Sequence, residues 1–81
     1  MLSVEILKRI QKIENKLGKK VKISLCHWPD PRLLGRIKER KKDIIVEFND
    51  HTPGFFWHLD GINYLLGILE TGKTNYLWRE S

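Results

Sequence analysis

The chain has 81 residues, of which 41% are hydrophobic and 31% are charged, and its formal net charge is +5 at pH 7. This composition is typical of a folded protein, and the length leaves no room for two ordinary domains, so we expect a single domain over residues 1–81. Cys26 is the one cysteine, which excludes an internal disulfide, and no apolar run is long enough for a membrane span or a secretory signal. We therefore expect a reducing, cytoplasmic location and no membrane partner.

Positive charge is concentrated in the first half of the chain. Residues 1–42 contain 13 Lys and Arg against 4 Asp and Glu, whereas residues 43–81 contain 2 against 6. This asymmetry favours an anionic partner for the first half, with nucleic acid ahead of a membrane surface. It is equally compatible with head-to-tail contact between copies of the chain.

Residues 3–17 have the pattern of an amphipathic helix. The apolar positions Ile6, Ile10, Ile13 and Leu17 follow helical spacing, and lysines and an arginine lie off this stripe. Ser3 can cap the first turn, and Gly18 can end the helix in the left-handed conformation. We expect the helix to pack on a sheet.

Three strand-like runs follow. In residues 19–26 apolar side chains alternate with Lys20, Lys22 and Ser24, and the prolines at 29 and 31 then predict a rigid, solvent-facing connection that presents Trp28. Residues 33–50 contain two alternating runs that predict a β-hairpin, with its turn at residues 40–43. Period-two alternation gives this hairpin an apolar face and a cationic face, on which Glu39 and Glu47 are acidic exceptions.

The last third of the chain has two interpretations. Residues 55–57 form an aromatic run that predicts a strand, and residues 62–69 and 74–79 are favoured as two further strands, because Asp60-Gly61 and the segment around Gly72 are typical of turns. The alternative is a second helix at about 60–71, since the leucines and Ile62 also have helical spacing. Gly61 and Gly67 count against the helix, at about 1 kcal/mol each relative to Ala.

We therefore expect a mainly β, α+β fold in which an N-terminal helix precedes a meander of six short strands over residues 19–79. Regular short strands with frequent turns suggest a small SH3-like or Sm-like barrel, or a strongly curved antiparallel sheet. The order of the first elements is similar to that of Sm-like barrels. This similarity is architectural, and it implies no particular functional residue.

The candidate site is the cationic face together with the exposed tryptophan. If the first two strands pair, their basic side chains form a patch that can follow phosphates, and an exposed aromatic ring can stack on a base. The usual alternative for strand lysines is a solvated face without a ligand. The predicted nucleic-acid-binding residues are Lys20, Lys22, Trp28, Arg36, Lys38, Arg40, Lys41 and Lys42.

Catalytic and metal-binding patterns are weak. Cys26, His27, His51 and His58 lack the paired spacing of zinc ligands, and Cys26 and His27 are strand neighbours that point to opposite faces. Residues 67–74 match the spacing of a phosphate-binding loop, but the helix and strand that such a loop requires do not follow, and a hairpin turn explains the segment better. We expect no metal, no cofactor and no enzymatic activity.

Two functions compete on these grounds. The first is a non-enzymatic basic domain that binds DNA or RNA through the cationic hairpin face. The second is a protein-interaction module or small inhibitor that binds an acidic protein partner, as suggested by the apolar side chains of residues 65–69. Homo-oligomerisation is compatible with either function.

Overall fold

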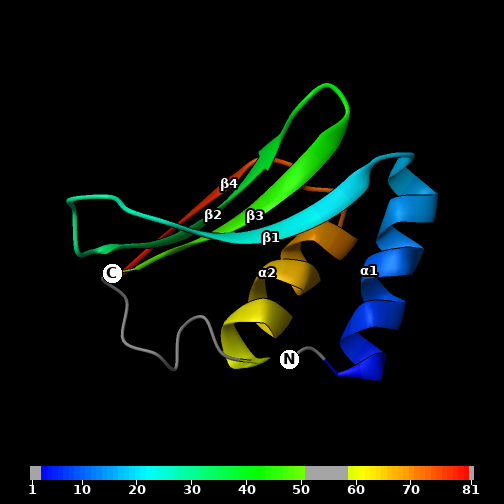
Figure 1. The fold of residues 1–81 in the computed structure, drawn as a ribbon, viewed down its shortest axis with the longest axis horizontal. Helices are drawn as coiled ribbons and strands as arrows, with labels where there is room; N and C mark the ends of the chain where they lie inside the picture. The colour runs from blue at the N-terminus through cyan, green and yellow to red at the C-terminus, as the bar shows by residue number, and fades with distance from the viewer. Residues whose placement is uncertain (1–2, 51–58, 81) are drawn as a thin grey trace.

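The computed structural model describes residues 3–50 and 59–80, and in this part of the chain two helices lie against one face of a four-stranded sheet (Figure 1). The elements are, in order, α1 (Val4–Leu17), β1 (Lys20–Cys26), β2 (Leu33–Glu39), β3 (Asp43–Asn49), α2 (Leu59–Glu70) and β4 (Tyr76–Arg79). The strand order is β1-β3-β2-β4. The protein is a small α+β domain with an N-terminal helix and a mixed sheet.

Helix α1 confirms the prediction for residues 3–17. The Ser3 side chain accepts a hydrogen bond from the Ile6 N–H at 3.2 Å, and Gly18 adopts a left-handed conformation with φ of 70°. Ile6, Ile10 and Ile13 are buried. Arg9 joins α1 to α2, because its guanidinium donates to both carboxylate oxygens of Glu70, at 2.7 and 3.0 Å.

The predicted hairpin is confirmed, but the expected meander is wrong. β2 and β3 pair antiparallel, and the Arg40 N–H donates to the Asp43 carbonyl at 2.7 Å to close the turn. β1 pairs with β3 in parallel, with Ile23 opposite Val46, so β3 separates β1 from β2. All seven residues of β3 are buried, which suits a central strand, whereas the alternating lysines of β1 suit an edge.

Residues 59–70 form helix α2, so the favoured strand at 62–69 is wrong and the alternative is correct. Ile62, Leu65, Leu66 and Leu69 are all buried against the sheet and α1. A strand would have pointed Leu65 and Leu66 to opposite faces and needed cover on both sides, whereas the helix turns them toward one core. Gly72, with φ of 95°, follows the end of α2 and precedes β4, so residues 67–74 form a helix terminus and not a hairpin.

The core lies between the helices and the inner face of the sheet. β3 contributes Ile44, Val46 and Phe48, and β4 contributes Tyr76 and Trp78. A Cβ atom at Gly35 of β2 would lie 2.9 Å from the Glu47 carbonyl oxygen of β3 and 3.3 Å from Leu65 Cδ1 of α2, so glycine makes room for both neighbours. The described strands leave β1 and β4 as open edges, and the predicted barrel is therefore not confirmed.

Two further expectations concern the rest of the chain. The aromatic strand predicted at residues 55–57 lies outside the described residues. Neither α1 nor α2 is long and apolar enough to cross a membrane.

Candidate nucleic-acid interface

The sheet face opposite the helices carries most of the residues predicted as a site. We call it the outer face, and define it by Lys20 and Lys22 of β1, Arg36 and Lys38 of β2, Arg40 after β2, and Asp43, Ile45, Glu47 and Asn49 of β3. The strand prediction placed the five cations on one face correctly. It had β1 and β2 as direct neighbours, whereas β3 runs between them.

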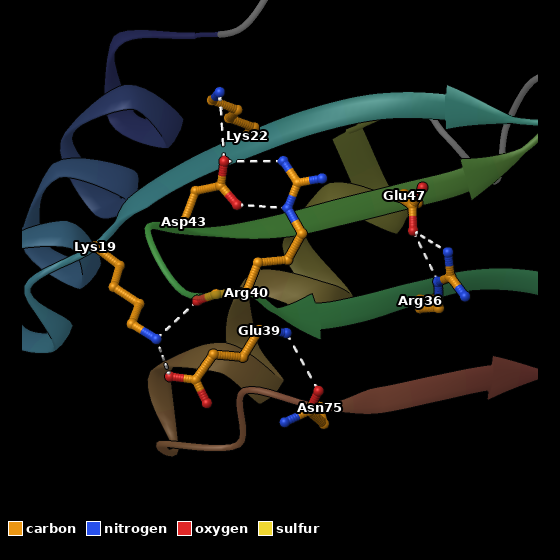
Figure 2. A network of polar contacts seen from close by, with 8 residues as sticks. All are labelled: Lys19, Lys22, Arg36, Glu39, Arg40, Asp43, Glu47 and Asn75. Atoms are coloured by element: carbon orange, nitrogen blue, oxygen red, sulfur yellow. Dashed lines mark hydrogen bonds and ion pairs between the residues drawn. The ribbon is translucent and has the colours of Figure 1, made fainter.

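Carboxylates of β3 therefore form the centre of the outer face. Arg40 donates to both carboxylate oxygens of Asp43, at 2.7 and 2.9 Å, and Lys22 approaches the same carboxylate from β1 at 3.4 Å. Arg36 donates to Glu47 at 2.7 Å (Figure 2). Three of the predicted phosphate ligands are thus already in ion pairs, each between adjacent strands or across the turn.

The remaining predicted cations carry positive charge that no carboxylate of the described residues neutralises in an ion pair. Lys20, Lys38, Lys41 and Lys42 are exposed, and no ion pair joins any of them to residues 3–50 or 59–80. Lys38 and Lys22 lie opposite Ile45 in the register, and Ile45 is only 9% exposed. This burial is what the aliphatic stems of long cationic side chains produce when they lie over an apolar neighbour.

The ion pairs change the acidity of Asp43. The hydrogen bonds from Arg40, more than those from Lys22, lower the pKa of Asp43 from 3.8 to about 2, against the opposing effect of burial. Because the folded state has the lower pKa, the carboxylate stabilises the fold above about pH 4. This stabilisation is lost as the pH falls from about 4 to about 2.

We accordingly expect Asp43→Asn to flatten the pH dependence of stability between about pH 4 and pH 2. Thermal unfolding followed by circular dichroism across this range measures the slope. Glu5→Gln is the control, because Glu5 is exposed and makes no ion pair with the described residues. An unchanged slope in Asp43→Asn would show that the Arg40 and Lys22 contacts do not act on folding.

Asn49 fixes the connection after β1. Its side chain is fully buried, accepts from the Trp28 N–H at 3.1 Å, and donates to the carbonyls of Leu33 at 2.7 Å and Asp30 at 3.1 Å. A buried amide with several partners specifies one geometry, because each unmade bond leaves a polar group without water. Asn49 therefore sets the position of Trp28 at the end of the outer face.

Trp28 is half-buried, and not as exposed as its neighbouring prolines suggest. The Arg36 guanidinium lies over its ring, 5.1 Å from the centroid, so one arginine contacts both the indole and Glu47. Cation–π contacts of this kind hold both partners in place. Trp28, Arg36 and Glu47 thus form one connected group, which we call the tryptophan cluster.

Cys26 extends the tryptophan cluster through a contact with Glu47. Its thiol donates to a Glu47 carboxylate oxygen. Burial, followed by the effect of this carboxylate, raises the pKa of Cys26, so the thiol stays protonated near neutral pH. Such a thiol has the reverse of the electrostatics that activate a catalytic cysteine.

The other chemistry-bearing residues make no recognisable centre in the described part. His27 Nδ1 lies 3.0 Å from Asp50 Oδ1, and both side chains are open to solvent. In residues 3–50 and 59–80, no three His, Cys, Asp or Glu side chains gather in a way that could bind a metal. His51 and His58, which were considered as ligands, lie outside those ranges.

A concave surface lies between α2 and β4, away from the outer face. It has a volume of about 440 Å³ and is mostly apolar, with Lys73 as the charged side chain of its lining: Asn63, Tyr64, Gly67, Ile68, Thr71, Lys73 and Tyr76. The Tyr64 and Tyr76 hydroxyls are 2.7 Å apart, and the Lys73 ammonium lies 5.7 Å from the Tyr76 ring centroid. We call this surface the α2–β4 groove.

Sequence reasoning missed Asp43 and Asn49 as site residues. A signal for both was present, because the positions 43, 45, 47 and 49 alternate with the apolar core positions of the same strand. The hairpin turn supplies Arg40 to Asp43, whereas the place of β3 beside β1 supplies Lys22 to Asp43 and the Trp28 connection to Asn49. Comparisons with protein-family models, curated proteins and solved structures find no match to the chain.

Proposed function

We propose that this chain is a small, non-enzymatic domain that binds nucleic acid through its outer face. The observation that supports this most is the charge of an uncovered sheet face: four cations on the strands and three at the turn surround two carboxylates. Ion pairing neutralises part of that charge, and the excess remains positive. An open cationic sheet is suited to the repeating charge of a phosphate backbone.

The exposed lysines are the phosphate contacts in this proposal. Lys38 on β2 and Lys41 and Lys42 at the turn have no competing carboxylate among the described residues. The paired arginines are a second group of phosphate contacts in this proposal. Glu47 orients Arg36 and Asp43 orients Arg40, and both guanidinium groups keep N–H donors toward solvent. Oriented arginines lose less side-chain entropy when they meet a phosphate.

Direct titration of labelled oligonucleotides tests the proposal. Fluorescence anisotropy at rising salt concentration should show affinity that falls linearly on logarithmic axes, with a slope of about 0.7–0.9 per phosphate contacted. With three to five contacts, the slope should be on the order of 2 to 4. Absence of binding at low salt, or an affinity that salt does not change, would contradict the proposal.

The competing function, recognition of an acidic protein partner, is favoured by one observation. In the lining of the α2–β4 groove, Tyr64 is 43% exposed, and Ile68 and Tyr76 lie next to it. Large apolar side chains next to a groove with a lysine and no carboxylate in its lining suit an acidic, partly apolar surface. A homo-oligomer through β4 uses the same surface.

Under this second function, Tyr64→Ala combined with Lys73→Glu, both in the groove lining, should remove a stoichiometric protein partner that survives nuclease treatment, while Lys38→Glu with Lys41→Glu should retain it. Co-purification followed by mass spectrometry measures the partner, and light scattering measures self-association. Equal retention by both variants would exclude the α2–β4 groove as the contact.

A further inference from the structure

The tryptophan cluster has features that the phosphate contacts alone do not explain. Trp28 lies at the end of the outer face that is remote from the cationic turn at Lys41 and Lys42. A phosphate-binding patch needs no aromatic ring, and a core ring would lie among the residues between sheet and helices. Trp28 is instead packed against Arg36, on the uncovered side of the sheet.

The backbone of Trp28 is fixed before any ligand arrives. Asn49 accepts from the Trp28 N–H at 3.1 Å and donates to the Trp28 carbonyl at 3.3 Å. Pro29 fixes its own φ and restricts the preceding Trp28 to extended backbone, and Asn49 also binds the Asp30 carbonyl at 3.1 Å. A ring held in this way loses little conformational entropy when a flat ligand stacks on it.

The arginine beside the ring is fixed as well. Two guanidinium nitrogens of Arg36 lie 2.7 Å from Glu47 Oε1, and the guanidinium carbon lies 5.1 Å from the centroid of the indole. The cluster thus presents an aromatic surface next to an oriented cation. A protein that stacks on a base and also contacts the phosphate of the same nucleotide needs an aromatic ring and a cation side by side.

We propose that the outer face selects single-stranded over duplex nucleic acid, and that Trp28, supported by Arg36, stacks on an unpaired base. The inference rests on the proposed function. In this proposal the bound nucleic-acid chain runs from the cationic turn along β2, past Lys38 and Arg36, to the tryptophan cluster. In a duplex the base faces are covered by their neighbours in the stack, so Trp28 contributes to binding only when a base is unpaired.

Anisotropy titrations with a single-stranded oligonucleotide and the matching duplex, at one salt concentration, test this directly. The wild-type protein should bind the single strand more tightly. Trp28→Ala should weaken single-strand binding by roughly ten-fold and leave duplex binding unchanged, and Trp28→Phe should restore most of the loss because it keeps a stacking ring. Thermal unfolding of both variants shows whether they fold.

Salt dependence separates stacking from charge. Trp28→Ala should leave the slope of the salt dependence unchanged, because no phosphate contact is lost, whereas Lys38→Glu should lower it. Equal affinity for single strand and duplex, or no effect of Trp28→Ala in a folded protein, overturns the inference but leaves the proposed function standing. Absence of binding to either nucleic acid overturns the proposed function itself.

Discussion

Lys38→Glu combined with Lys41→Glu should weaken binding of single-stranded nucleic acid on the order of 100-fold, because two phosphate contacts become repulsions. The slope of the salt dependence should fall by about 1.4, as expected for two lost contacts on a single strand. Both lysines are exposed and make no ion pair with the described residues, so their reversal breaks none. Anisotropy titration at several salt concentrations measures both quantities.

These two lysines are better probes than the arginines of the same face. A glutamate at position 36 would face Glu47, and a glutamate at position 40 would face Asp43, so loss of binding could follow from a damaged sheet. The matched control is Lys8→Glu with Lys16→Glu on α1. It makes the same change in net charge on the helical side of the molecule and should reduce binding only slightly.

The control also decides what the result means. If the α1 variant loses as much affinity as the sheet variant, net charge alone governs binding and the outer face has no special role. If neither variant loses affinity, the nucleic-acid proposal is wrong. Circular dichroism and thermal unfolding of both proteins establish that each retains the wild-type fold.

Asn49→Ala should destabilise the fold by about 2–4 kcal/mol, because several backbone groups lose a buried side-chain partner. For a domain of this size we expect the Tm to fall by roughly 8–30 °C. The same change should also reduce single-strand affinity, since Trp28 would no longer be held at the end of the outer face. Thermal unfolding and anisotropy measure the two effects.

Asn75→Ala is the matched control for Asn49. The Asn75 side chain also accepts a backbone N–H, that of Glu39 at 3.2 Å, but Asn75 is exposed, so water can replace it. We expect a loss of at most about 1 kcal/mol in the control. Equal stability of Asn49→Ala and Asn75→Ala would show that burial of the Asn49 amide does not contribute to folding.

Local structure with a strong periodic pattern could be predicted from the sequence. Helix α1 carries its own cap at Ser3 and its own terminator at Gly18, and both act within the first and last turns. The β2–β3 hairpin was also predictable, because its two runs are adjacent and alternate in register. In these cases the deciding contacts lie between residues that are close in the chain.

Helix α2 marks the limit of such reasoning. Residues 62–69 suit either a helix or a strand, since a short, nearly continuous apolar run has no clear period. The sheet and α1 decide in favour of the helix, because its buried leucines share one core. Gly72 has the positive φ that its turn-like context predicts, but it follows the end of a helix and does not lie in a hairpin.

The sequence by itself determined the two faces of the hairpin, the excess of cations on one of them and the place of Trp28 next to the prolines. Only the tertiary structure decided that β3 lies between β1 and β2, since a parallel pairing joins residues more than twenty positions apart and leaves no local pattern. That one choice brings Lys22 to Asp43 and Asn49 under the Trp28 connection, whereas the Arg40–Asp43 and Arg36–Glu47 pairs belong to the hairpin. The site therefore consists of residue types visible in the sequence and of partners that strand order supplies.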